Sequence, residues 1–89
     1  MPKLYATESQ NDPMVQVKYF TPDSNWTWYA WEFQEVDGEG MFFGYVEGFE
    51  GELGYFSLSE LQEARGPMGL RIERDLFFKP TSYSQIRAQ

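Results

Sequence analysis

Residues 52–80 read ELGYFSLSELQEARGPMGLRIERDLFFKP, and this stretch predicts a strand, a capped helix, a tight turn and a second strand. Apolar residues alternate over 53–56, which is the period of a strand. The S-L-S-E run that follows is a capping box, in which the hydroxyl of Ser57 accepts a hydrogen bond from the amide of Glu60. We therefore predict one short helix near residues 58–65, ended by a Gly-Pro pair. Because so short a helix is unstable alone in water, it has to pack on a sheet.

The second strand of this stretch covers residues 70–78, where alternating apolar residues predict one buried face. Arg74 interrupts that face, so we predict that its side chain is at least half buried and that a carboxylate or several carbonyl groups surround the guanidinium. Glu32 is the first candidate, because it interrupts the apolar face of its own strand in the same way. The alternative is a register in which Arg71 and Glu73 point inward. The apolar positions of the strand are Leu70, Ile72, Leu76 and Phe78.

Three further strands are predicted earlier in the chain, over residues 14–20, 26–35 and 41–47. They are separated by the turn sequences TPDSN and VDGEG, whose Pro, Asp, Asn and Gly residues favour chain reversal. Gly44 lies in the middle of the third strand, which indicates a bulge there or a ring packed closely over it. Short connections of this kind favour antiparallel pairing.

The predicted fold class is α+β: a small, mainly antiparallel sheet of four to five strands with one short helix near residues 58–65. A chain of 89 residues forms a single domain, residues 1–89. Both ends are polar and lack periodicity, so we predict that they are loose at about residues 1–13 and 81–89.

The composition limits the chemistry that the chain can carry. It has no cysteine and no histidine, so thiolate nucleophiles, disulfides and imidazole bases are excluded. We therefore assign no catalytic residue, no metal ligand and no cofactor. The net charge of −7 argues against binding to anionic membranes, and no apolar run approaches the ~20 residues needed to span one. No signal peptide precedes the fold, so a cytoplasmic protein is expected.

Two groups of carboxylates have a chemical alternative to an ordinary surface role. Glu73 and Asp75 share one face of a strand and would suit a hydrolase-like carboxylate pair, but a salt-bridged outer face is the favoured interpretation. The acidic, glycine-containing turns at residues 37–39 and 47–52 carry oxygen ligands of the kind that calcium takes. Neither turn has the spacing of an EF-hand loop, so solvated turns are favoured.

Residues 32–63 contain nine acidic residues and no Lys or Arg. This charge repels phosphates, so direct binding of nucleic acid is disfavoured even though the neighbouring tryptophans are able to stack on bases. The acidic tract has two interpretations: it keeps the protein soluble, or it imitates a phosphate backbone and binds a basic site on a protein partner. The candidate partner-binding residues are Trp26, Trp31, Glu35, Asp37, Glu39, Glu47, Glu50 and Glu52.

Two motifs resemble those of an uncharacterised family, a domain of unknown function in small proteins of plasmids, conjugative elements and phages. The first is F-T-P-D-x-x-x-T-W, at residues 20–28. The second is E-L-G-Y-x-S-L-x-E-L followed by R-G-P-x-G-L-x-I-E-R-D-x-x-F-K-P, within residues 52–80. The resemblance covers most of residues 19–80. It implies an accessory protein of a mobile element and no particular mechanism.

Composition, charge and resemblance together favour a small noncatalytic accessory protein of a mobile element or phage. We expect it to bind a protein of the host cell, in the cytoplasm, through an acidic and aromatic surface. The alternatives are a hydrolase-like enzyme that uses carboxylates, which requires a concave pocket, and a structural or assembly component, which requires a large apolar patch. The sequence leaves the partner's identity and the oligomeric state open.

Overall fold

A computed structural model of the chain describes residues 12–22, 24–48, 50–65 and 68–88. It contains a five-stranded antiparallel sheet, a separate two-stranded sheet and two short helices, which confirms the predicted α+β class. The order in the large sheet is β5-β4-β3-β2-β6. Its strands are β2 (Val17–Phe20), β3 (Thr27–Val36), β4 (Glu39–Glu47), β5 (Gly51–Ser57) and β6 (Glu73–Arg74). The remaining elements are β1 (Met14–Val15), α1 (Leu58–Glu63), β7 (Thr81–Ser82) and α2 (Tyr83–Arg87).

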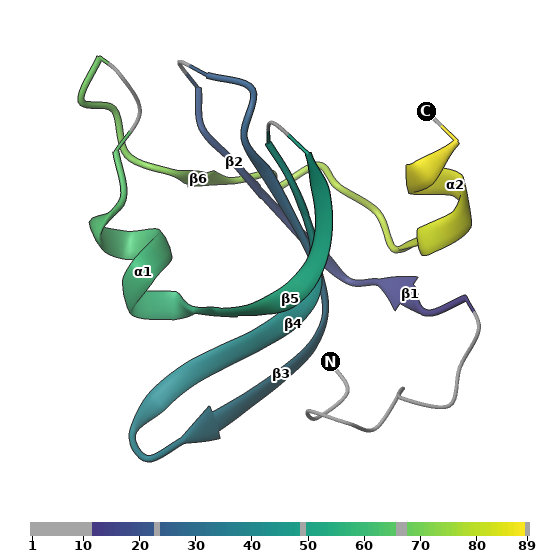
Figure 1. The fold of residues 1–89 in the computed structure, drawn as a ribbon, viewed down its shortest axis with the longest axis horizontal. Helices are drawn as coiled ribbons and strands as arrows, with labels where there is room; N and C mark the ends of the chain where they lie inside the picture. The colour runs from purple at the N-terminus through teal and green to yellow at the C-terminus, as the bar shows by residue number, and fades with distance from the viewer. Residues whose placement is uncertain (1–11, 23, 49, 66–67, 89) are drawn as a thin grey trace.

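The large sheet is strongly curved and is covered on both faces (Figure 1). The helix α1 packs on the concave face, and α2 with the β1–β7 pair packs on the convex face. Each face therefore has its own apolar cluster. The concave cluster is centred on Val17, Ala30, Phe42, Phe56 and Leu61, and the convex cluster on Val15, Tyr29, Trp31, Tyr45 and Ile86.

A β-bulge at Trp31 shifts the register between β3 and β4. Ala30 pairs with Gly44, whereas Glu32 pairs with Phe43, so Trp31 is the extra residue. The backbone of β3 comes so close to Gly44 that a Cβ there would lie 1.8 Å from the carbonyl oxygen of Tyr29. The sequence predicts a bulge in the strand of Gly44 or a ring over it; in the structure the bulge lies opposite Gly44, on β3, and backbone atoms lie over the glycine. Because bulges bend a strand and increase its twist, this one contributes to the curvature of the sheet.

The helix α1 begins as its sequence predicts. The hydroxyl of Ser57 accepts a hydrogen bond from the amide of Glu60 at 3.1 Å, and Ser57 has the extended backbone of an N-cap. Leu61 is buried and holds the helix on the concave face. Neither helix in the described part of the chain is long and apolar enough to cross a membrane.

The predicted strand over residues 14–20 is divided into two in the structure. β2 pairs with β3, while β1 turns away at Gln16 and pairs with β7 near the end of the chain. The amide of Gln16 donates to the carbonyl oxygen of Ala30 at 2.8 Å, so the first strand stays attached to β3 as it changes direction. One polar residue between two valines gives no local sign of this change, because the partner strand lies more than 60 residues further on.

The predicted strand over residues 70–78 is wrong in its length. Among the described residues of this stretch, only β6 joins the large sheet, and Arg71 forms an isolated bridge with Arg65. Leu76 and Phe77 are 82% and 93% exposed. The strand ends at Asp75, whose carboxylate accepts from the amide of Phe77 and whose carbonyl accepts from the amide of Phe78. An Asx-type turn of this kind competes with the sheet ladder.

The predicted burial and pairing of Arg74 are also wrong. Arg74 is exposed on β6 and lies opposite Tyr19. Glu32 is buried, at 3% exposure, but it lies on β3, and β2 separates the two strands. The bulge moves Glu32 opposite Phe43, whose ring belongs to the convex cluster, whereas Tyr19 belongs to the concave one.

The prediction for residues 81–89 is a loose segment; in the structure, residues 81–87 form β7 and α2. The hydroxyl of Ser82 caps α2, and Ile86 is buried in the convex cluster. The chain before β1 holds α2 in place, since the amide and hydroxyl of Ser84 donate to the carboxylate of Asp12 at 2.8 Å each. The packing of α2 could not be predicted from the sequence, because Ile86 is the one fully apolar residue of this helix. The predicted loose segment over 1–13 falls outside the described residues except for Asp12 and Pro13.

Candidate functional site

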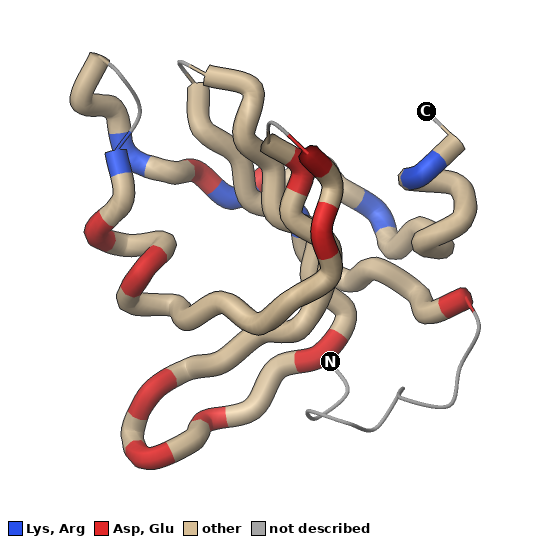
Figure 2. Tube along the Cα trace, in the orientation of Figure 1, with Lys and Arg blue, Asp and Glu red and all other residues tan. Residues whose placement is uncertain are grey.

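Six of the nine acidic residues of the tract lie in two groups at opposite ends of β4 (Figure 2). One group lies at the hairpin between β3 and β4, and the other at the turn between β4 and β5. A strand of nine residues separates the two ends by about 30 Å, so they cannot act as one small site. The hairpin group is Glu35, Asp37 and Glu39, and the turn group is Glu47, Glu50 and Glu52.

At the hairpin end, Glu35 and Asp37 are exposed. Asp37 and Gly38 both have positive φ angles, 52° and 80°, as a tight two-residue hairpin turn requires. Glu39 points toward α1 instead: its carboxylate accepts from the amide of Ser59 at 3.2 Å and from the hydroxyl of Ser59 at 2.6 Å. Glu39 therefore fastens the hairpin to the first turn of α1, and its main role is structural.

We predict that the pKa of Glu39 lies below its ordinary value of 4.5, because the hydrogen bonds from Ser59 favour the ionised carboxylate. A depressed pKa stabilises the folded protein above pH 4.5, and this stability is lost as the pH falls through the folded-state pKa. The melting temperature of Glu39→Gln should therefore lie below that of the native protein at neutral pH, and the difference should vanish in acid. Carboxyl NMR titration checks the pKa directly, and Ser59→Ala should raise it toward 4.5. An unchanged pKa in that variant would contradict the assignment.

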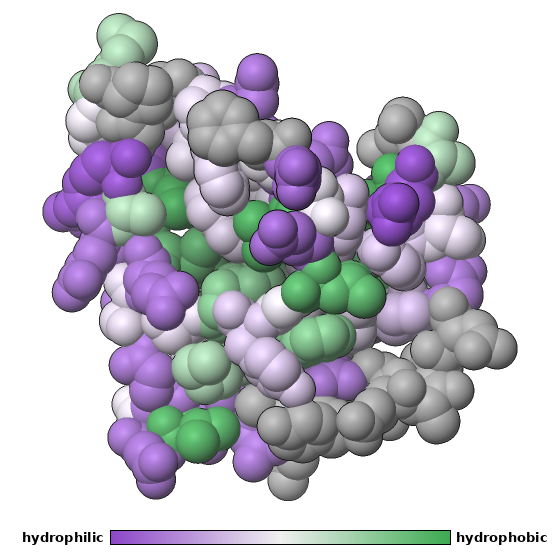
Figure 3. Space-filling model, viewed as in Figure 1, coloured by the Kyte–Doolittle hydropathy of each residue, from purple (hydrophilic) through white to green (hydrophobic). Residues whose placement is uncertain are grey.

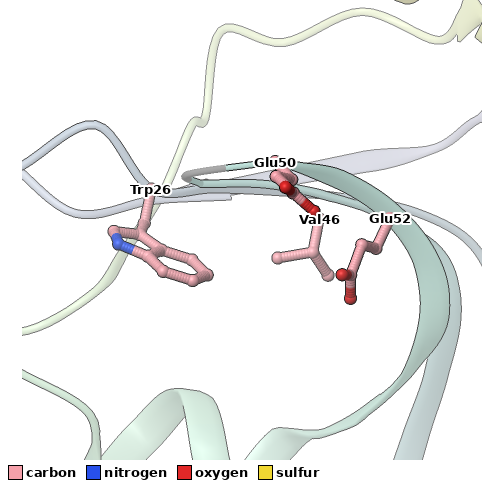
Figure 4. A pocket seen from close by; sticks show the side chains of 4 residues that line it. All are labelled: Trp26, Val46, Glu50 and Glu52. Atoms are coloured by element: carbon pink, nitrogen blue, oxygen red, sulfur yellow. The ribbon is translucent and has the colours of Figure 1, made fainter.

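At the other end of β4, the turn toward β5 borders an open pocket of about 250 Å³ on the concave face. Its lining residues are Trp26, Val46, Glu50 and Glu52 (Figure 4). Figure 4 shows the indole ring of Trp26 on one side of Val46 and the carboxylate of Glu52 on the other, with α1 across the opening. Figure 3 shows apolar side chains gathered between α1 and the sheet on this face, with hydrophilic side chains around them. We refer to these four residues as the Trp26 pocket.

The ring of Trp26 is held in position by its neighbours. A Cβ added to Gly48 would lie 2.6 Å from Cζ3 of Trp26, so the indole lies directly against the backbone of the β4–β5 turn. The rings of Trp26 and Trp28 are stacked, with centroids 6.1 Å apart and planes 28° from parallel. Trp26 nevertheless remains 36% exposed. The exposed part of the indole therefore forms an aromatic wall of the pocket.

The carboxylates of the Trp26 pocket lie at the acidic edge of the sheet. Glu52 begins a cross-strand row that continues through Val46, Trp28 and Tyr19 to Arg74. With strands about 4.8 Å apart, Arg74 is about 19 Å from Glu52. In the described part of the chain, neither Glu50 nor Glu52 forms a salt bridge. Their negative charge is therefore available to a cation that enters the pocket.

Besides the three residues at the hairpin, two predicted partner-binding residues lie on the convex face. Trp31 is 3% exposed, and its ring packs against Phe43 and Tyr83 in the convex cluster, so the prediction that it lies on the surface is wrong. Glu47 is exposed but shares the convex face with Tyr45, since the two alternate with Val46 along β4. The pKa of Arg87 is raised, mainly because its guanidinium donates a hydrogen bond to the hydroxyl of Tyr83. The negative charge of Glu47 adds to this rise.

Of the eight predicted residues, the structure thus brings together Trp26, Glu50 and Glu52. Val46 was missed, because an apolar strand residue gives no sign of its function. Among the described residues, no three acidic side chains are close enough to hold a metal ion.

Comparison with known proteins identifies a family and no individual relative. No curated protein and no solved structure matches the chain. A family model described as "Protein of unknown function (DUF2958)" matches residues 3–86, which is nearly the whole chain. This confirms the predicted resemblance to an uncharacterised family with a domain of unknown function. The chain belongs to the DUF2958 family.

Proposed function

We propose that this protein is a noncatalytic accessory protein of a mobile element that binds a basic host protein in the cytoplasm. The Trp26 pocket is the observation that supports this proposal, because it places an accessible indole beside two carboxylates. Aromatic residues that remain accessible at a concave surface are frequent anchors of protein interfaces. The mobile-element origin is supported by the resemblance of the motifs alone.

The charge of the surface selects the class of partner. A net charge of −7 repels nucleic acid, while a carboxylate-lined pocket attracts a basic protein surface and speeds its approach. Such attraction acts over about 8–10 Å and is screened by salt. We therefore expect the affinity to fall as the salt concentration rises, mainly through a slower association rate.

The test uses two double variants with the same change in net charge. Glu50→Lys with Glu52→Lys reverses the carboxylates of the Trp26 pocket, whereas Glu35→Lys with Asp37→Lys reverses those at the far hairpin. Both pairs are exposed, so both variants should fold. The hairpin variant should melt slightly below the native protein, because Asp37 has a positive φ angle that aspartate tolerates better than lysine. Partners captured from host lysate by the native protein are identified by mass spectrometry, purified and titrated in a salt series.

The pocket variant should lose binding to the purified partner, and the hairpin variant should retain most of it. An equal loss of binding in both variants would show that binding depends on the net charge alone. It would contradict an interface at the pocket. Binding that is insensitive to salt and to both variants would refute the proposal.

A further inference from the structure

We infer that the Trp26 pocket receives a single arginine side chain of the partner, and this inference rests on the proposed function. The volume of about 250 Å³ is below the ~300–1,000 Å³ of pockets that hold drug-sized ligands. It is therefore suited to one side chain inserted from a protein surface. Three features of its lining select a guanidinium group: the aromatic wall, the two carboxylates and the apolar floor.

The aromatic wall favours a planar cation. A cation over the face of tryptophan is attracted by the ring's quadrupole, and arginine adds stacking because its guanidinium is flat. The contact with Gly48 and the stacking on Trp28 hold the indole of Trp26 in one orientation. A rigid ring costs little conformational entropy when a flat group stacks on it, which favours arginine over the rounded ammonium of lysine.

The carboxylates supply the opposite charge at the other side of the pocket. Glu50 and Glu52 are both exposed and lie two residues apart at the start of β5 and in the turn before it. A carboxylate accepts two parallel hydrogen bonds from a guanidinium, a geometry that lysine cannot provide. Figure 4 shows Val46 between the indole and Glu52, where it would contact the methylene stem of an inserted arginine. The pocket thus matches the stem, the flat face and the hydrogen-bond edge of arginine.

The experiment uses the native chain and small blocked amino acids, so it needs no partner. N-acetyl-arginine amide is titrated into ¹⁵N-labelled protein, and the indole N–H signals are followed; Trp26→Phe identifies the signal of Trp26. This signal should shift and saturate, with a dissociation constant in the millimolar range, because one side chain supplies a limited binding free energy. N-acetyl-citrulline amide, which is flat but neutral, should cause no saturable shift. N-acetyl-lysine amide should bind at least about threefold more weakly than the arginine compound.

Matched variants locate the binding. Glu52→Gln should weaken the arginine compound about three- to tenfold, since it replaces a charge-assisted hydrogen bond by a neutral one. Glu47→Gln makes the same change at the same end of β4 but on the convex face, and it should leave the affinity unchanged. Circular dichroism of both variants verifies that the fold is intact.

Equal binding of the lysine and arginine compounds, or an unchanged affinity in Glu52→Gln, would overturn the inference. So would the absence of a saturable shift at Trp26. Failure of this inference can be distinguished from failure of the proposed function. Suppose that a captured partner binds in a way that depends on Glu50 and Glu52, but the arginine compound does not bind. This result refutes the arginine pocket and leaves the proposed function standing. The opposite result is binding of the arginine compound without any captured partner whose binding depends on the pocket carboxylates. That result would refute the proposed function, and with it the inference that a partner supplies the arginine.

Discussion

Gly44→Ala is expected to destabilise the protein by ~3 kcal/mol or more, which lowers the melting temperature by roughly 12–24 °C in a domain of this size. The new methyl group would lie 1.8 Å from the carbonyl oxygen of Tyr29 and 2.8 Å from Cα of Ala30. Both are backbone atoms, so no side-chain rotation relieves the overlap. Either β3 moves away from β4 or the bulge at Trp31 is lost, and each outcome disturbs the central pair of the sheet.

The matched control is Gly54→Ala, at the position on β5 that pairs directly with Gly44. A Cβ at Gly54 has no atom within 4 Å, and its backbone does not have a positive φ angle. This variant should be neutral or slightly stabilising, since alanine has less conformational freedom in the unfolded chain. Thermal and urea unfolding of the two variants measure the difference. Similar melting temperatures for both would show that the close approach of β3 to Gly44 does not hold in solution.

Ile86→Ala is expected to cost ~2–5 kcal/mol, because it removes a buried side chain from the convex cluster and leaves a cavity. Ile86 is 4% exposed and packs with Val15 and the aromatic rings that face α2. The melting temperature should fall by at least about 8 °C. The exposed neighbour Gln85 provides the control, and Gln85→Ala should change the stability by less than ~0.5 kcal/mol.

This pair of variants tests whether the end of the chain belongs to the folded domain. A polar, frayed tail would tolerate both substitutions equally, as the composition of residues 81–89 alone suggests. Equal melting temperatures for Ile86→Ala and Gln85→Ala would therefore contradict the docked helix. Faster hydrogen exchange confined to α2 in Ile86→Ala would show that the helix detaches locally before the sheet unfolds.

The elements with strong local signals were predicted with nearly correct bounds. The apolar and aromatic runs of β3 and β4, the turn at Asp37-Gly38 and the cap at Ser57 are all present in the structure. Each depends on residues within a few positions of one another, so period and turn chemistry are sufficient to predict it. The strand predicted over 70–78 failed because one aspartate forms a competing turn, a signal that the alternating apolar residues obscured.

The candidate site was predicted only in part. Trp26, Glu50 and Glu52 are found together, but Trp31 is buried and Glu47 lies on the other face. The bulge is the reason that the side chains sharing each face of the sheet differ from those of a regular ladder. In the hairpin closed by Val36 and Glu39, an unbroken register would place Trp28 opposite Glu47, whereas the bulge places it opposite Val46. A shift of one residue reverses which side chains share a face, so it decides which residues surround the pocket.

The sequence by itself determined the class of the fold, the acidic character of the surface and the absence of thiol and imidazole chemistry, because these follow from composition and local period. Only the tertiary structure decided that β1 pairs with β7, that Ile86 is buried and that one end of β4 carries a pocket. These features depend on contacts between residues far apart in the chain. Their free energies come from the packing of two apolar clusters against the sheet, which no short stretch of sequence encodes.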